Sequence, residues 1–131
     1  MERKKPREGD GMCKLVPLGN GKSVADIKYG HVMNIAEKAA ACKHINRIML
    51  FGSAIEDRCA ERSDIDIAVF GTQPKAQYYR SKEFKRFQDE VYLYDTNQDY
   101  DILYFMDGHD SNAPILRDIN RGVEIYRRVP A

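Results

Sequence analysis

Two carboxylates on one predicted strand are the residues of this sequence best placed to do chemistry. Asp64 and Asp66 stand at the start of an alternating apolar run that continues to Phe70. On a β-strand, residues two apart project from the same face, so these two side chains converge. Like charges held side by side repel, and a bound divalent cation relieves that repulsion. Because neither His nor Cys adjoins the pair, its hard oxygen donors favour Mg²⁺ over zinc.

A glycine turn precedes the acid pair. The apolar run Ile48–Phe51 has the pattern of a buried strand and stops at Gly52. Ser53 and Glu56 have the spacing of a capping box, which predicts a short helix whose free backbone N–H groups, with the Ser53 hydroxyl, face an anion. A phosphate is the expected anion. A phosphate-binding turn joined to a metal-binding acid pair predicts phosphoryl-type chemistry on a nucleoside triphosphate.

The order of these residues resembles the signature of the polymerase-beta-like nucleotidyltransferase superfamily. The matching motif is Gly52-Ser53, ten intervening residues and Asp64-Ile65-Asp66. The chain of 131 residues is also similar in size to the minimal nucleotidyltransferases (MNT). The resemblance implies an α/β fold with a palm-like mixed β-sheet and helices packed on one side. It also implies transfer of a nucleoside monophosphate, with AMP from ATP as the expected case, assisted by two Mg²⁺ ions.

The same resemblance implies a third carboxylate on a neighbouring strand, serving as metal ligand and as base for the incoming hydroxyl. Asp101 matches this role because it stands in the β-prone run Tyr100–Phe105. Asp95 and Asp99 are the alternative positions. Arg58 and Arg62 lie between the turn and the acid pair, where an arginine would neutralise triphosphate charge, and a solvated surface role is the alternative. The implied catalytic and metal-binding residues are Asp64, Asp66 and Asp101, and the implied nucleotide-binding residues are Gly52, Ser53 and Arg62.

Three acceptors or roles remain open at the level of the sequence. Resemblance to MNT antitoxins paired with HEPN toxins implies a tyrosine of a partner HEPN-type toxin as the acceptor of AMP. A small antibiotic hydroxyl is the alternative, as in the aminoglycoside and lincosamide nucleotidyltransferases. A binding antitoxin that neutralises its partner without catalysis is the third. The tyrosine-rich segment from Tyr92 to Tyr104 suits a surface covered by a partner, although cross-strand packing explains it almost as well.

Length and composition bound the remaining possibilities. The chain fits one domain, which we place at residues 23–131, after a flexible N-terminal segment of residues 1–22. With 21 basic and 20 acidic residues, it lacks the charge excess expected of a protein that binds long nucleic acids. Its three cysteines form no Cys-x-x-Cys motif and read as reduced thiols, and no apolar run approaches the ~18 residues of a membrane span. We therefore expect a cytoplasmic protein with no membrane contact.

Apolar periodicity and capping residues predict the elements around the acids. Ser23 is the expected N-cap of a first helix that runs to about Lys43, and Ser81 is the expected N-cap of a second. Residues 73–80 between them are polar and read as a turn. A last helix begins near Pro114 and ends at Gly122, and a final strand follows at residues 123–126.

Overall fold

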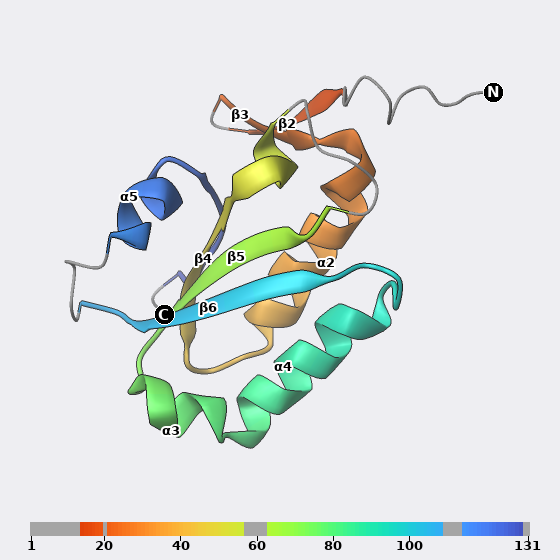
Figure 1. Ribbon diagram of the computed structural model, residues 1–131. Helices are drawn as coiled ribbons and strands as arrows, with labels where there is room; N and C mark the ends of the chain where they lie inside the picture. The colour runs from red at the N-terminus through yellow and green to blue at the C-terminus, as the bar shows by residue number, and fades with distance from the viewer. Residues whose placement is uncertain (1–13, 20, 57–62, 109–113, 130–131) are drawn as a thin grey trace.

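A mixed β-sheet forms the centre of the protein (Figure 1). The computed structural model describes residues 14–19, 21–56, 63–108 and 114–129. Within these residues, four strands make up the central sheet, in the order β6-β5-β4-β7. Their bounds are β4 Ile45–Phe51, β5 Ile65–Gly71, β6 Tyr100–Met106 and β7 Val123–Arg127. β5 and β6 are parallel, whereas β4 is antiparallel to both β5 and β7. The predicted α/β class with a mixed sheet is confirmed.

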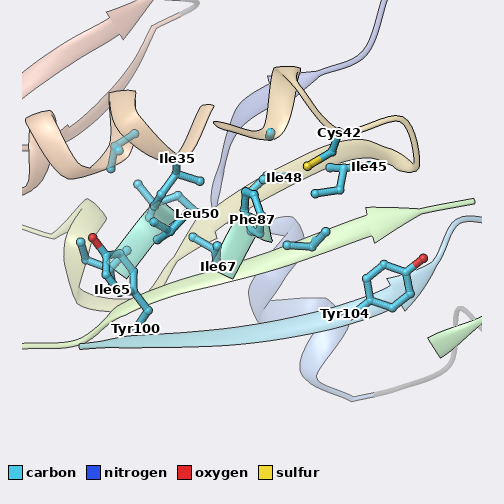
Figure 2. Close-up of a cluster of buried hydrophobic side chains, with 14 of the residues drawn as sticks. Ile35, Cys42, Ile45, Ile48, Leu50, Ile65, Ile67, Phe87, Tyr100 and Tyr104 are labelled. Carbon is cyan, nitrogen blue, oxygen red and sulfur yellow. The ribbon is translucent and has the colours of Figure 1, made fainter. Parts of the chain in front are cut away.

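One face of the sheet is covered by two long helices, α2 (Tyr29–Ala40) and α4 (Lys82–Leu93). Alternation along the strands sends one set of apolar side chains to this face. Figure 2 shows the resulting core, in which Ile35 and Phe87 from the two helices lie over Leu50 and Ile67 of the sheet. All four side chains are fully buried, and each such burial stabilises the fold by about 1.5–3 kcal/mol.

The opposite face of the sheet is covered in part by the short helix α5 (Ile115–Asn120). Ile119 of α5 is buried with the strand residues that alternate with the main core, among them Met49, Ala68 and Phe70. The prediction of helices on one side is therefore wrong for α5. The reason is the two-residue strand period, which gives this second face its own apolar side chains and so a second place for a helix to pack.

The N-terminal part of the described chain is a hairpin, where the sequence predicted a loose arm and a helix N-cap. β2 (Leu15–Gly19) pairs in antiparallel fashion with β3 (Lys22–Ala25), so Ser23 lies in a strand and caps no helix. A 3₁₀ helix, η1 (Asp26–Lys28), then leads into α2, which ends at Ala40. Val24 is fully buried, which explains the difference: its β-branched side chain joins the core from a strand. Residues 1–13 lie outside the described chain.

The connection between β5 and α4 is also more ordered than the sequence suggested. A one-turn helix, α3 (Lys75–Tyr79), replaces the predicted turn because Tyr78 is fully buried and stacks on Tyr104 at 4.9 Å between ring centroids. The Tyr78 hydroxyl donates to the Glu83 carboxylate at 2.8 Å. The predicted N-cap Ser81 is confirmed, since its Oγ accepts a hydrogen bond from the Phe84 amide at 3.0 Å.

Cys42 is a buried free thiol, and burial raises its pKa to about 11, so it is protonated at neutral pH. Cys13 and Cys59 lie outside the described residues. None of the helices in the described ranges has the length and apolar content needed to cross a membrane.

Candidate active site

Asp66 and Asp101 lie next to each other on adjacent strands. β5 and β6 run parallel, and their register makes these two residues direct partners. Cross-strand partners project from the same face of a sheet with Cβ atoms about 5 Å apart. That face is the one that α5 covers only in part, because Asp66 alternates with the core residues Ile65 and Ile67. The strand register thus brings together two acids that are far apart in the sequence.

Asp66 carries the electrostatic cost of this arrangement. Its side chain is partly buried, whereas Asp64 and Asp101 are exposed. Burial raises the pKa of the Asp66 carboxyl, and the negative charges of Asp101 and Asp64 raise it further. The charges of Asp64 and Asp101 therefore both act on Asp66 at this end of the sheet. A group of like charges held in this way is a favourable place for a cation to bind.

Gly52 holds the turn against Asp66 and is needed for two separate reasons. Its backbone has φ +77°, a left-handed conformation that residues other than glycine adopt only at a cost in free energy. It follows Phe51, the strand residue paired with Asp66. A Cβ atom at position 52 would overlap the Asp66 Oδ2 atom. The absence of a side chain at Gly52 therefore lets the carboxylate of Asp66 sit directly against the turn.

The turn itself is a 3₁₀ helix, η2 (Gly52–Ile55), and the predicted capping box is wrong. The helix begins two residues earlier than the capping box predicts, with Phe51 in place of Ser53 at its N-cap and no side-chain capping bond. Ser53 consequently lies inside the helix, and Glu56 has extended backbone at its C-terminal end. The Glu56 amide instead donates to the Ser53 carbonyl at 3.0 Å. The sequence thus predicted the short helix correctly but not the hydrogen bonds at its ends.

Comparison with known protein families identifies the family of this chain. A family profile described as Polymerase beta, Nucleotidyltransferase matches residues 33–129, which include the glycine turn and all three acids. The chain belongs to this family. Among curated proteins, none matches the sequence. The domain is thus a nucleotidyltransferase domain, in agreement with the superfamily that the motif resembles.

The position of Asp101 distinguishes it from the two alternative acids in the nucleotidyltransferase domain. Asp95 is bonded to other groups, because its carboxylate lies 3.0 Å from His31 Nε2 and accepts from the Asn97 amide at 3.0 Å. Asp99 precedes β6, and its backbone carbonyl accepts from the Ile65 amide at 3.1 Å. Of these three acids, Asp101 is the one whose register partner is Asp66.

A buried lysine that the sequence analysis missed fixes the start of both acid-bearing strands. Lys28 is 1% exposed, and its Nζ donates to the Ser63 carbonyl at 2.8 Å and to Gln98 Oε1 at 2.6 Å. Gln98 Nε2 in turn donates to the carbonyls of Ser63 and Asp99, at 2.9 and 2.7 Å. Ser63 directly precedes Asp64. This network ties together the segments that enter β5 and β6, and no local pattern in the sequence signals it.

The described residues leave the predicted metal site and the predicted arginine contact untested. Within the described ranges, no group of three or more His, Cys, Asp or Glu side chains is close enough together to hold a metal ion. The strand register brings Asp66 and Asp101 together. Among the described residues, Asp64 does not complete a three-residue metal-binding cluster with them. Arg62, the predicted nucleotide contact, lies outside the described residues, as does Arg58.

The tyrosines predicted to form a partner surface are mainly core residues of the nucleotidyltransferase domain. Tyr104 is fully buried and Tyr100 is 8% exposed. The hydroxyl of Tyr92, which is partly buried, donates to the Tyr100 carbonyl at 3.1 Å. Tyr94 is 52% exposed, and its ring contacts His31 edge to face. Cross-strand and helix packing, the alternative explanation, accounts for most of this segment.

Proposed function

We propose that this protein transfers AMP from ATP to a hydroxyl group on a partner protein, and that the acceptor is a tyrosine of a HEPN-type toxin. The observation that carries the proposal is the pairing of Asp66 with Asp101 on adjacent parallel strands beside Gly52. Family membership supports nucleotidyl transfer in general. The resemblance of the Gly52-Ser53 and Asp64-Ile65-Asp66 motif to that of MNT antitoxins supports a protein acceptor.

The residues present fit a divalent cation. Asp64, Asp66 and Asp101 offer oxygen donors of the kind that Mg²⁺ prefers, and their charges already raise the pKa of the Asp66 carboxyl. A bound cation would offset the repulsion among these carboxylates. When bound, two Mg²⁺ ions would neutralise triphosphate charge and stabilise the attacking and leaving oxygens.

The residues would divide the work according to their positions. Asp64 and Asp66 would hold the cations that grip the triphosphate, with Gly52 and Ser53 letting the backbone approach a phosphate. Asp101 would accept the proton of the acceptor hydroxyl. The hydroxyl oxygen then forms a bond to the α-phosphorus, and the bond between that phosphorus and the bridging oxygen breaks. Pyrophosphate leaves, and AMP remains on the acceptor as a phosphodiester.

Asp101 is suited to its part by its place in the sheet. β6 is the edge strand on this side of the central sheet, so Asp101 is exposed on its outer margin while Asp66 lies further in. An acceptor that arrives from solvent would reach Asp101 first. Attack in line with the leaving group requires such an approach from the side opposite to pyrophosphate.

The experiment is a transfer assay with a defined partner. The purified product of the neighbouring gene is incubated with this protein, Mg²⁺ and ATP labelled in the α-phosphate, and the label is located by mass spectrometry. We expect AMP on a tyrosine of the partner. Asp64→Ala should abolish the labelling, and Lys85→Ala, which changes an exposed residue on α4, serves as the control that retains it.

Other outcomes point to other functions. Tight binding of the partner without label would support a binding antitoxin. No transfer to the partner, together with modification of an aminoglycoside or lincosamide, would move the assignment to antibiotic modification. Absence of AMP transfer to any of these acceptors, with ATP binding intact, would contradict the proposal.

A further inference from the structure

A second charged site lies at the opposite end of the sheet from the acids. A cavity of about 550 Å³ opens where β4 begins and where β6 and β7 end. Its lining is mainly basic and consists of Asn46, Arg47, Asp107, Arg127 and Arg128. We refer to this cavity as the arginine pocket. None of these residues belongs to the motif that identified the nucleotidyltransferase site.

The side chain of Arg47 has fewer polar contacts with the rest of the fold than the other side chains that line the arginine pocket. Its guanidinium carbon lies 4.1 Å from the centre of the Phe70 ring, an arrangement that holds the planar group in place. The side chain of Arg47 forms no hydrogen bond or ion pair with the described residues. A guanidinium group has five N–H donors. Stacking therefore fixes the plane of Arg47 and leaves its donors available to a ligand.

Arg127 stands directly opposite Arg47. The two residues are cross-strand partners in the antiparallel pair of β4 and β7. Like charges directly opposite each other destabilise a sheet. Arg127 offsets this in part through an ion pair with Glu124, at 2.6 and 2.8 Å, but its side chain is 63% exposed. An exposed ion pair of this kind contributes little to stability, so Arg127 can exchange Glu124 for a stronger partner.

The other lining residues are held by the fold and shape the arginine pocket. Arg128 donates to the backbone carbonyls of Cys42 and Ile45. Asn46 Nδ2 donates to Asp107 Oδ2 at 3.1 Å, which closes one side. Since these contacts engage Arg128, Asn46 and Asp107, Arg47 and Arg127 are the groups that can turn toward a ligand.

We propose that the arginine pocket is a binding site for a phosphate monoester or free phosphate. Arg47 and Arg127 would each donate through the paired N–H groups of a guanidinium, the geometry that matches phosphate. A phosphate monoester carries about two negative charges at neutral pH and has three acceptor oxygens. It can therefore neutralise both arginines at once. A single carboxylate would satisfy one of them, as Glu124 already does for Arg127.

The arginine pocket is separate from the site of nucleotidyl transfer. Phe70, on which Arg47 stacks, follows Asp66 by four residues on β5. At about 3.3 Å per residue, the two sites lie roughly 13 Å apart along the strand. The proposal does not rest on the proposed function, because phosphate binding here requires neither ATP nor the acids.

The test is a titration of the full chain with inorganic phosphate, without ATP or Mg²⁺, followed by NMR of the arginine Nε–Hε groups. Sodium chloride keeps the ionic strength constant. We expect saturable shifts of the Arg47 and Arg127 signals. Arg127→Gln should weaken binding about tenfold, the usual effect of losing a charge-assisted hydrogen bond. Arg86→Gln is the matched control, because Arg86 is also exposed and pairs with a Glu on its own element.

Further titrations identify the source of the phosphate group. A short oligoribonucleotide with a 5′-phosphate is compared with the same oligomer lacking it. Tighter binding of the phosphorylated oligomer than of both the unphosphorylated oligomer and inorganic phosphate would assign the site to a nucleic-acid terminus. Binding of the phosphorylated oligomer no tighter than that of inorganic phosphate would assign the site to a free or small-molecule phosphate. Shifts that do not saturate, equal weakening by Arg86→Gln, or binding of a glutamate-rich peptide in place of phosphate would overturn the proposal.

Discussion

The two ends of the central sheet place like charges on neighbouring strands in the same way but with opposite sign. At one end, Asp66 is paired with Asp101 across β5 and β6. At the other, Arg47 is paired with Arg127 across β4 and β7. Both pairs cost free energy in the absence of a ligand of opposite charge. Each end is therefore better explained by what it binds than by what it contributes to folding.

The two ends differ in how firmly the protein holds them. Asp66 is partly buried against Gly52, and the network around Lys28 fixes the segments that enter both acid-bearing strands. Arg127 is exposed and exchangeable, and Arg47 is held by one aromatic ring. Chemistry needs reacting groups held within a fraction of an ångström, whereas simple binding tolerates a looser site. This difference supports catalysis at the acid end and binding at the arginine end.

The largest expected effect separates the two ends by activity. Asp101→Asn should lower AMP transfer by about a hundredfold or more, because it removes the group that accepts the hydroxyl proton. ATP binding should be largely retained. Arg127→Gln should leave transfer within about threefold of wild type, since the arginine pocket lies roughly 13 Å away. Label transfer at saturating ATP measures both, and full activity in Asp101→Asn would send the search to Asp95 or Asp99.

A glycine substitution tests the rigidity of the acid end. Gly52→Ala should destabilise the fold by about 2–4 kcal/mol and lower transfer at least tenfold, since it adds both backbone strain and a clash with Asp66. Gly108→Ala is the control because Gly108 has a similar φ of +74° and open space around it. Chemical denaturation gives both stabilities. Equal losses in the two variants would show that backbone strain alone matters at position 52.

Removal of the buried lysine tests how the two acid-bearing strands are aligned. Lys28→Met should destabilise the protein by about 1–3 kcal/mol, because the Gln98 side chain loses its buried donor. Transfer should fall as well, although Lys28 is a positioning residue with no contact to substrate. Lys85→Met, on the exposed surface of α4, should change stability by less than about 0.5 kcal/mol. A stable Lys28→Met variant with full activity would contradict this role.

The smallest expected effect concerns the pH dependence of stability. The pKa of Asp66 is raised in the folded protein, so its ionised form destabilises the fold at neutral pH. Asp66→Asn should therefore stabilise the protein by a few tenths to about 1 kcal/mol at pH values above the pKa of folded Asp66. The gain should vanish as the pH falls below 3.8, the ordinary pKa of an aspartate, because the carboxyl is then protonated in both the folded and the unfolded state. Denaturant titrations between acidic and neutral pH measure this. A gain that does not change with pH would contradict the electrostatic explanation.

Local patterns predicted the acid end well. The alternation around Asp64 and Asp66, the glycine that ends an apolar run and the β-prone segment around Asp101 are all readable without knowledge of distant contacts. Their placement on one sheet edge followed from the family resemblance. The capping box failed because a shift of two residues at the start of a 3₁₀ helix changes which side chain can cap it.

Long-range contacts account for what the sequence did not predict. Val24 lies in a strand because it pairs with Val16. The helix α3 forms because the ring of Tyr78 stacks on that of Tyr104. Arg47 and Arg127 become neighbours through the pairing of β4 with β7. Such pairings depend on the whole fold, so neither the buried Lys28 network nor the arginine pocket has a signal in any short window of sequence.

The most direct test of the central claim places a metal–nucleotide complex on the structure. Mn²⁺ with ATP replaces Mg²⁺ in an NMR experiment, and paramagnetic broadening of backbone amides locates the ion. We expect the strongest broadening at the amides of Gly52, Asp66 and Asp101, and much weaker broadening at Arg47. In the Asp66→Asn variant, the broadening should be lost at all of these amides. Broadening centred elsewhere, or unchanged in that variant, would contradict a nucleotidyltransferase site built on the paired acids.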